Sequence, residues 1–140
     1  MTKSIAQLCL YSVLMVSSQI AIATTPLIQQ ITPSLSISGQ MTADKFSKLM
    51  MEGYRSVIVN QPDHEAGNNV SINQLRHIGA KQGIAVIYQP IIGEKITRKD
   101  VETFAQYYQQ LAKPILMVYR NGNLSNQLFN EAKRLGLIDE

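Results

Sequence analysis

Cysteine is nearly absent from this sequence. The 140 residues include one cysteine, Cys9, and no tryptophan. Because Cys9 lies in the apolar N-terminal stretch, the rest of the chain has neither a disulfide bond nor a thiolate nucleophile. Covalent catalysis by cysteine is therefore excluded from any domain that follows this stretch.

A strong charge of either sign is also missing. The chain has 13 lysine and arginine residues against 10 aspartate and glutamate residues, which gives a formal net charge of +3 at pH 7. The basic residues are scattered along the chain and do not gather on one predicted helix or stripe. We therefore expect no nucleic-acid partner.

The first 23 residues have the pattern of a secretory signal peptide. Lys3 precedes an apolar stretch that ends at Ala21-Ile22-Ala23, a small-x-small cleavage pattern. Cleavage near Ala23 leaves one domain at residues 24–140, which is 140 − 23 = 117 residues, in the periplasm or outside the cell. The alternative is an uncleaved membrane anchor at 4–23, the one way in which we expect the chain to contact a membrane. Its apolar character is diluted by Gln7, Ser12, Ser17, Ser18 and Gln19.

Beyond Pro33, strand-like and helix-like segments alternate. The predicted strands are 35–39, 55–60, 84–89 and 114–119, and the predicted helices are 42–52, 71–83, 98–111 and 126–136. Ser71 with Gln74 forms a capping-box start, and Thr97 is a good N-cap. The alternation predicts a three-layer α/β fold, in which helices flank a largely parallel central sheet of about four to five strands. Ligands of such folds bind outside the carboxyl ends of the strands.

The segment VYRNGNLS, residues 118–125, follows the last predicted strand at such a carboxyl end. An apolar run leads into a Gly/Asn turn and then into a helix-like stretch. That order is typical of a strand, an anion-binding loop and a helix.

Four segments occur in an informative order: ITPSLSISGQMTADKF, YRSVIVNQPDHE, IAVIYQPIIGEKITRKDVETF and PILMVYRNGNLS. The more specific parts are Ser-Gly-Gln at 38–40 and Asn-x-Pro-Asp at 60–63. Together they resemble the small bacterial tyrosine-phosphatase-like proteins of the beta-lactamase-hydrolase-like group, relatives of dual-specificity phosphatases, over residues 31–136. The resemblance implies a cysteine-phosphatase-like fold.

The resemblance also implies a His-Cys-x5-Arg-Ser phosphate loop between the last strand and the last helix. In that family the thiolate attacks phosphorus, loop N–H groups hold the phosphate oxygens and arginine clamps the anion. Our alignment places the His at Val118, the Cys at Tyr119, the Arg at Leu124 and the Ser at Ser125. Only the length of the loop, Gly122 and Ser125 agree with the phosphate loop of the family.

The candidate anion loop therefore lacks both reactive groups. Its residues are Tyr119, Arg120, Asn121, Gly122, Asn123, Leu124 and Ser125. Tyr119 is a candidate nucleophile, but a phenol titrates near pH ~10 and is bulky. Arg120 offers a positive charge one residue after the nucleophile position, where bidentate clamping is difficult.

Asp63 and Glu94 are the candidate general acids. In the family's Asn-x-Pro-Asp motif the aspartate lies near the site, and Glu94 precedes the loop by about the distance at which related phosphatases keep their acid. Asp63-His64-Glu65 is the densest ionisable cluster, but three consecutive side chains do not converge easily on one ion. We expect no metal and no cofactor.

Three functions remain open at this level. The first is an exported pseudophosphatase: a non-catalytic domain, not an active enzyme, whose loop 119–125 binds an anion, a phosphorylated ligand or a protein partner. The alternative is a hydrolase acting on phosphate or related esters through Asp63 or Glu94. In the third, the loop is a structural turn in which Leu124 packs inward.

Overall fold

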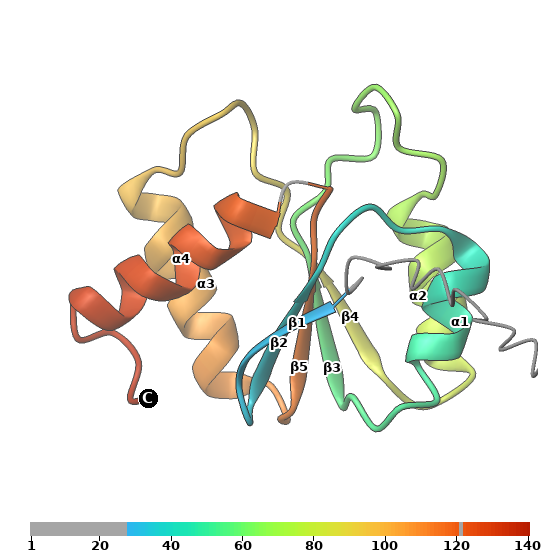
Figure 1. Ribbon diagram of the computed structural model, residues 1–140, viewed down its shortest axis with the longest axis horizontal. Helices are drawn as coiled ribbons and strands as arrows, with labels where there is room; N and C mark the ends of the chain where they lie inside the picture. The colour runs from blue at the N-terminus through green and yellow to red at the C-terminus, as the bar shows by residue number, and fades with distance from the viewer. Residues whose placement is uncertain (1–27, 121) are drawn as a thin grey trace, which may run out of the picture.

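The computed structural model describes residues 28–120 and 122–140, which form one sheet with helices on both faces (Figure 1). The predicted signal segment and Asn121 lie outside the described residues. The elements in chain order are β1 (Ile28–Thr32), β2 (Leu35–Ser38), α1 (Ala43–Leu49), β3 (Ser56–Val59), α2 (Ile72–Ala80), β4 (Ala85–Tyr88), α3 (Arg98–Gln110), β5 (Ile115–Val118) and α4 (Gly122–Arg134). No helix in this described part is long and apolar enough to cross a membrane.

The sheet has five strands in the order β1-β2-β5-β3-β4. Neighbouring strands from β2 to β4 are parallel, whereas β1 pairs antiparallel with β2. In Figure 1, α1 and α2 cover one face of the sheet, and α3 and α4 cover the other. This arrangement confirms the predicted three-layer α/β fold with a largely parallel sheet.

The central strand β5 contributes to a hydrophobic cluster on each face. Ile115 and Met117 pack in the cluster that includes α3 and α4, while Leu116 and Val118 pack in the cluster that includes α1 and α2. All four side chains are at most 1% exposed. Successive residues of a strand point to opposite faces, so a strand covered on both faces is apolar throughout.

The predicted helix starts are confirmed at α2 and α3. The Ser71 hydroxyl accepts from the Gln74 amide, and the Gln74 side chain accepts from the Ser71 amide. Thr97 and Asp100 form the same reciprocal pair at α3. Each box satisfies two backbone N–H groups that the first helical turn leaves without intrahelical partners.

The strand β1 was not among the predicted strands. It pairs with β2 across a turn at Pro33 and Ser34 and forms one edge of the sheet. Its residues are intermediate or exposed. A strand with so little burial lacks the apolar alternation by which strands are recognised.

The last helix begins at Gly122, four residues before the predicted start at Asn126. Leu124 is buried on α4 together with Leu128, so the apolar stripe extends into the loop segment. A Cβ atom at Gly122 would lie 3.3 Å from the Ile37 Cγ2 atom. The missing side chain lets the first turn of α4 approach β2 closely.

Candidate functional site

The candidate site lies where the parallel strands end and their following loops meet (Figure 1). Segment 118–125 connects β5 to α4 there, as the sequence predicts. The loop after β3 (60–71) and the loop after β4 (89–97) lie at the same end of the sheet, the end formed by the carboxyl ends of the parallel strands. Asn121, one of the candidate loop residues, lies outside the described residues.

Tyr119, at the nucleophile position, is buried. It is 2% exposed and belongs to the hydrophobic cluster that includes α3 and α4. Burial raises the pKa of its phenol above the usual value, and the nearby Glu65 carboxylate raises it further, against a lowering by Arg120. Both main causes disfavour the phenolate, which is the nucleophilic form.

Leu124 and Ser125, the aligned arginine and serine positions, are also buried. Leu124 is 4% exposed within the same cluster as Tyr119, and Ser125 is 0% exposed. The position aligned with the arginine needs one correction. The family's loop has five residues between the cysteine and the arginine, so a count from Tyr119 places the arginine position at Ser125. Only four residues separate Tyr119 from Leu124. Neither position supplies a guanidinium.

Ser125 is bonded into a buried polar network. Its hydroxyl donates to Asn60 Oδ1 at 2.9 Å, and Asn60 Nδ2 donates to the Gln89 carbonyl at 3.0 Å. Gln89 Nε2 donates to the Asp100 carbonyl of α3 at 2.8 Å. The network joins the start of α4 to the segments that follow β3 and β4. These contacts position the loop, and they occupy the serine hydroxyl.

Arg120 is directed toward the loop after β3. Its Nη2 atom lies 2.5 Å from Glu65 Oε1, and its Nη1 donates to the Ala66 carbonyl at 3.4 Å. Its backbone amide donates to Gln61 Oε1 at 2.9 Å. The guanidinium therefore neutralises Glu65. The adjacent cavity, lined also by Gln40, has a volume of about 10 Å³, which is room for about one water molecule.

Asp63 supports the start of α2. Its Oδ1 atom accepts from the Ile72 amide at 2.7 Å, and its own amide donates to the Tyr88 hydroxyl at 3.1 Å. Ile72 is the first residue of α2, so this carboxylate satisfies an N–H group that has no intrahelical partner. This contact gives Asp63 a structural role.

Glu94 is exposed on the loop after β4, and His64 is exposed on the loop after β3. Within residues 28–120 and 122–140, no three His, Cys, Asp or Glu side chains come close enough to hold a metal ion. The structure thus does not gather the ionisable residues of this edge into one cluster.

Sequence reasoning missed the residues that connect the loops. Asn60 was noted only as part of a motif, and the roles of Gln61, Glu65 and Gln89 were not predicted. Asn60, Gln61 and Gln89 are each at most 7% exposed. Each follows an apolar strand, and a polar residue at such a position is the signal that could have identified them.

The structure resembles known phosphatases. It matches a candidate phosphatase from Neisseria meningitidis Z2491 with a TM-score of 0.70 and 24% identity, over 81% of this chain and 80% of that one. It matches the core catalytic domain of a PP-IP phosphatase from S. cerevisiae with a TM-score of 0.59 and 18% identity, over 80% of this chain and 67% of that one. The fold is therefore that of the cysteine phosphatases.

The sequence gives the narrower assignment. The chain belongs to the family described as "Beta-lactamase hydrolase-like protein, phosphatase-like domain", whose model matches residues 27–135. It is 29% identical over 102 residues to a beta-lactamase hydrolase-like protein of Xylella fastidiosa, which is 73% of this chain and 24% of that protein. The chain thus spans about a quarter of the length of the curated relatives it matches.

Proposed function

We propose that this chain is a phosphatase-like domain that acts by binding and does not hydrolyse phosphate esters through a cysteine intermediate. One observation carries the proposal: the side chain at the nucleophile position is Tyr119, which is 2% exposed and has a raised phenol pKa. A nucleophile needs access to phosphorus and a lowered pKa or an adjacent base. Tyr119 has neither access nor a lowered pKa.

The binding surface we propose consists of loop 63–69 and Arg120. His64, Ala66, Gly67 and Asn69 are exposed on it, and the Arg120 side chain is 47% exposed. Of the occupants that the sequence leaves open, the geometry favours a protein partner. The cavity beside Arg120 is about 10 Å³, and the Arg120 guanidinium is already paired with Glu65, so free phosphate or sulfate fits poorly.

The hydrolase that would use Asp63 or Glu94 is less well supported. The Asp63 carboxylate accepts from the Ile72 amide, and Glu94 is exposed on another loop. General acid–base catalysis requires a group within hydrogen-bond reach of the reacting atoms. No contact in the described residues holds either acid over segment 119–125.

The direct test is an assay of the purified protein with aryl phosphates. We expect no turnover above buffer, and no saturable change in the amide NMR signals of 122–125 with phosphate or sulfate. Vanadate-sensitive hydrolysis would refute the loss of activity. Saturable shifts without hydrolysis would keep the non-catalytic function but replace the protein partner with an anion.

Restoring the missing groups tests whether the loop is still a phosphate cradle. One double variant combines Tyr119→Cys with Leu124→Arg, and a second combines Tyr119→Cys with Ser125→Arg. The two variants introduce the cysteine together with an arginine at either of the two possible spacings. We expect neither double variant to gain activity, because both arginines replace side chains that are at most 4% exposed. Tyr119→Cys alone is the matched control, and circular dichroism checks that each variant folds. Gained activity in a folded double variant would show that only two side chains separate this loop from a working cradle.

We also propose that the protein is exported to the periplasm or secreted. The pattern of Lys3, an apolar stretch and Ala21-Ile22-Ala23 supports cleavage near Ala23. Cleavage there would leave all of the described helices and strands in the mature protein. Mass spectrometry of the protein from a periplasmic fraction should find Thr24 at the N-terminus, and an intact N-terminus would contradict cleavage.

A further inference from the structure

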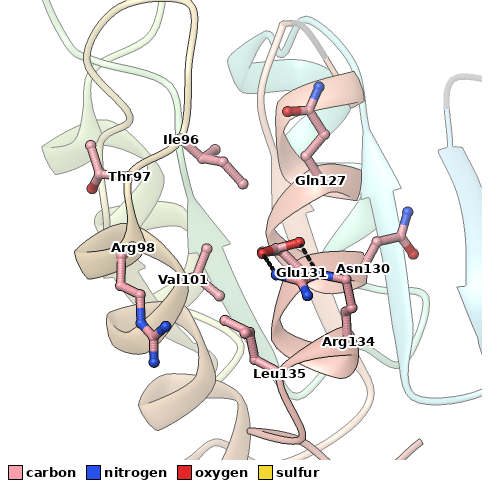
Figure 2. A pocket seen from close by; sticks show the side chains of 9 residues that line it. All are labelled: Ile96, Thr97, Arg98, Val101, Gln127, Asn130, Glu131, Arg134 and Leu135. Atoms are coloured by element: carbon pink, nitrogen blue, oxygen red, sulfur yellow. Dashed lines mark hydrogen bonds and ion pairs between the residues drawn. The ribbon is translucent and has the colours of Figure 1, made fainter.

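Two kinds of arginine–glutamate ion pair occur in the described residues. The first kind lies within one helix. Figure 2 shows Arg134 hydrogen-bonded to Glu131 on α4, and Arg98 contacts Glu102 in the same way on α3. The side chains of Arg98 and Arg134 are 68% and 67% exposed. Pairs of this kind are ordinary features of a solvated helix surface and contribute little to stability.

The pair of Arg120 and Glu65 is of the second kind, because it joins two separate loops. Arg120 Nη2 lies 2.5 Å from Glu65 Oε1, and the two side chains are 47% and 22% exposed. The loops that carry them follow β5 and β3 and meet at the carboxyl ends of the parallel strands (Figure 1). Only the folded chain brings these side chains together, and the pair is less exposed than those on the helices.

The Glu65 carboxylate is held through both of its oxygens. Oε1 contacts Arg120, and Oε2 accepts from Gln61 Nε2 at 2.5 Å. Gln61 Oε1 accepts from the Arg120 backbone amide at 2.9 Å, so the NH₂ end of the Gln61 side chain is the one that faces the carboxylate. Gln61 is 7% exposed. Two donors from separate segments thus converge on one carboxylate.

The two donors would serve any carboxylate at this position. Hydrogen bonds from a guanidinium or an amide to a carboxylate are stronger than those between neutral groups. Among the described residues, Glu65 is the only acidic side chain that pairs with Arg120. Removal of the Glu65 carboxylate would therefore leave a positive charge without its counter-ion and the buried Gln61 donor without its acceptor, which is unfavourable.

The loop that carries Glu65 has hydrogen bonds of its own. Asn68 Nδ2 donates to the Pro62 carbonyl at 3.0 Å, and Gln40 Nε2 donates to the Gly67 carbonyl at 2.9 Å. The Glu65 amide donates to the Pro62 carbonyl, and the Asn68 amide donates to the Glu65 carbonyl. The Glu65 side chain can therefore leave by rotation about its own bonds while the loop backbone stays in place.

We propose that Gln61 and Arg120 form a carboxylate-binding site that the chain's own Glu65 occupies, and that a protein partner enters it with an acidic side chain that displaces Glu65. Glu65 is an internal competitor, because a tethered group has a high effective concentration. The choice of a protein partner rests on the proposed function, whereas the site itself does not.

The site is tested by chemical rescue in an amide NMR titration of the full protein. Glu65→Ala removes the internal carboxylate, and sodium acetate supplies a free one. We expect saturable shifts at Arg120, at the Gln61 side chain and in loop 63–69, with an affinity at least about tenfold above that of the wild-type protein. Acetamide, the neutral isostere, should give no saturable shift. Glu52→Ala removes an exposed carboxylate just after α1 and is the matched control, which should behave like the wild-type protein.

The chemistry of the partner is tested with two tripeptides blocked at both ends, Gly-Glu-Gly and Gly-Gln-Gly. We expect the glutamate peptide to bind Glu65→Ala about tenfold more tightly than the wild-type protein, and the glutamine peptide to bind neither. Addition of Arg120→Gln to Glu65→Ala should abolish the binding of the glutamate peptide.

A folded Glu65→Ala protein that gives no saturable response to acetate would overturn the site, and so would an equal response of Glu52→Ala. Equal binding of the two peptides would overturn the acidic partner. If Glu65→Ala does not fold, Glu65→Gln keeps the side-chain length, removes the charge and gives the same comparison with a smaller gain. Hydrolysis of aryl phosphates by the wild-type protein would refute the proposed function alone, so the two failures are distinguishable.

Discussion

The role of the Ser125 side chain depends on the residues that surround it. The resemblance assigns it to an anion-binding loop, but its hydroxyl is 0% exposed and donates to Asn60 Oδ1. Asn60 is equally buried and donates to the Gln89 carbonyl. A buried polar group is costly unless it is paired, so each residue of this hydrogen-bond network needs its partner. At this scale the loop is specified by hydrogen bonding within the protein.

Replacing Ser125 with alanine should therefore destabilise the fold. The change leaves Asn60 Oδ1 without its donor in a buried site, which costs about 1–3 kcal/mol, partly offset by the better helix propensity of alanine. We expect urea denaturation to show a loss of about 1–2 kcal/mol. The matched control is Ser47→Ala on the exposed side of α1, which should change stability by less than about 0.5 kcal/mol. Equal effects of the two substitutions would argue against the bond.

Tyr119 makes stability depend on alkaline pH. Its folded-state pKa is raised by burial and by Glu65, so the folded state holds the phenolic proton more tightly than the unfolded state does. This contribution is fully present below the unfolded value of about 10, and it is lost as the pH rises through the folded pKa. Tyr119→Phe should flatten the decline in stability above about pH 10, measured as the urea midpoint against pH. A decline identical to that of the wild-type protein would contradict this linkage.

At the scale of elements, α2 is held by contacts at its start and along its packed face. Asp63 binds the Ile72 amide, and Ser71 binds the Gln74 amide. Gly79 faces β4, where a Cβ atom would lie 2.6 Å from the Val86 Cγ2 atom and 3.1 Å from the Ile84 carbonyl oxygen. The close contact of the helix with the strand requires a residue without a side chain.

Gly79→Ala should consequently destabilise the protein, although alanine favours helices. The propensity gain is about 1 kcal/mol, while overpacking in a well-packed core costs typically ~1–3 kcal/mol. The backbone oxygen cannot move without shifting β4, so we expect a net loss of about 1–2 kcal/mol in urea denaturation. Gly39→Ala, where nothing lies within 4 Å of the added Cβ, is the control and should be nearly neutral. A stabilised Gly79→Ala protein would show that α2 can move away from β4.

The elements were predictable where local signals agree with the packing. Continuous apolar runs identified β3 and β5, and capping residues identified the starts of α2 and α3. The strand β1 was missed because it is an edge strand with little burial. The start of α4 was placed late because Gly122 and Asn123 are typical of turns, while the burial of Leu124 that extends the helix is a tertiary effect.

The candidate site was less predictable than the fold. Loop position follows from strand order, and the absent thiol is visible in the sequence. The direction of Arg120 toward Glu65 depends on how the loop after β3 folds over the edge, across 55 positions of chain (120 − 65). No local pattern encodes such a contact. The same holds for the bond between Ser125 and Asn60.

At the scale of the whole molecule, the two helix layers share the central strands β3 and β5, each of which contributes side chains to both hydrophobic clusters. β5 lies between β2 and β3 and places alternate side chains in the two hydrophobic clusters. The clusters lie on opposite faces of the sheet and are connected by the backbone of the strands whose side chains they share. A defect in β5 should therefore weaken both layers together.

Met117→Ala tests this coupling, because Met117 is 0% exposed and belongs to the cluster that includes α3 and α4. Truncating a buried methionine costs about 2–5 kcal/mol, a large part of the ~5–15 kcal/mol typical of a small domain. We expect one urea transition, and hydrogen exchange in which the slow amides of α1 and α2 lose as much protection as those of α3 and α4. Met51→Ala is the control, since Met51 is 77% exposed and should change stability by less than about 0.5 kcal/mol. If the amides of α3 and α4 alone lost protection, the two layers would unfold independently. Packing of β5 against both layers would then not make the molecule one cooperative unit.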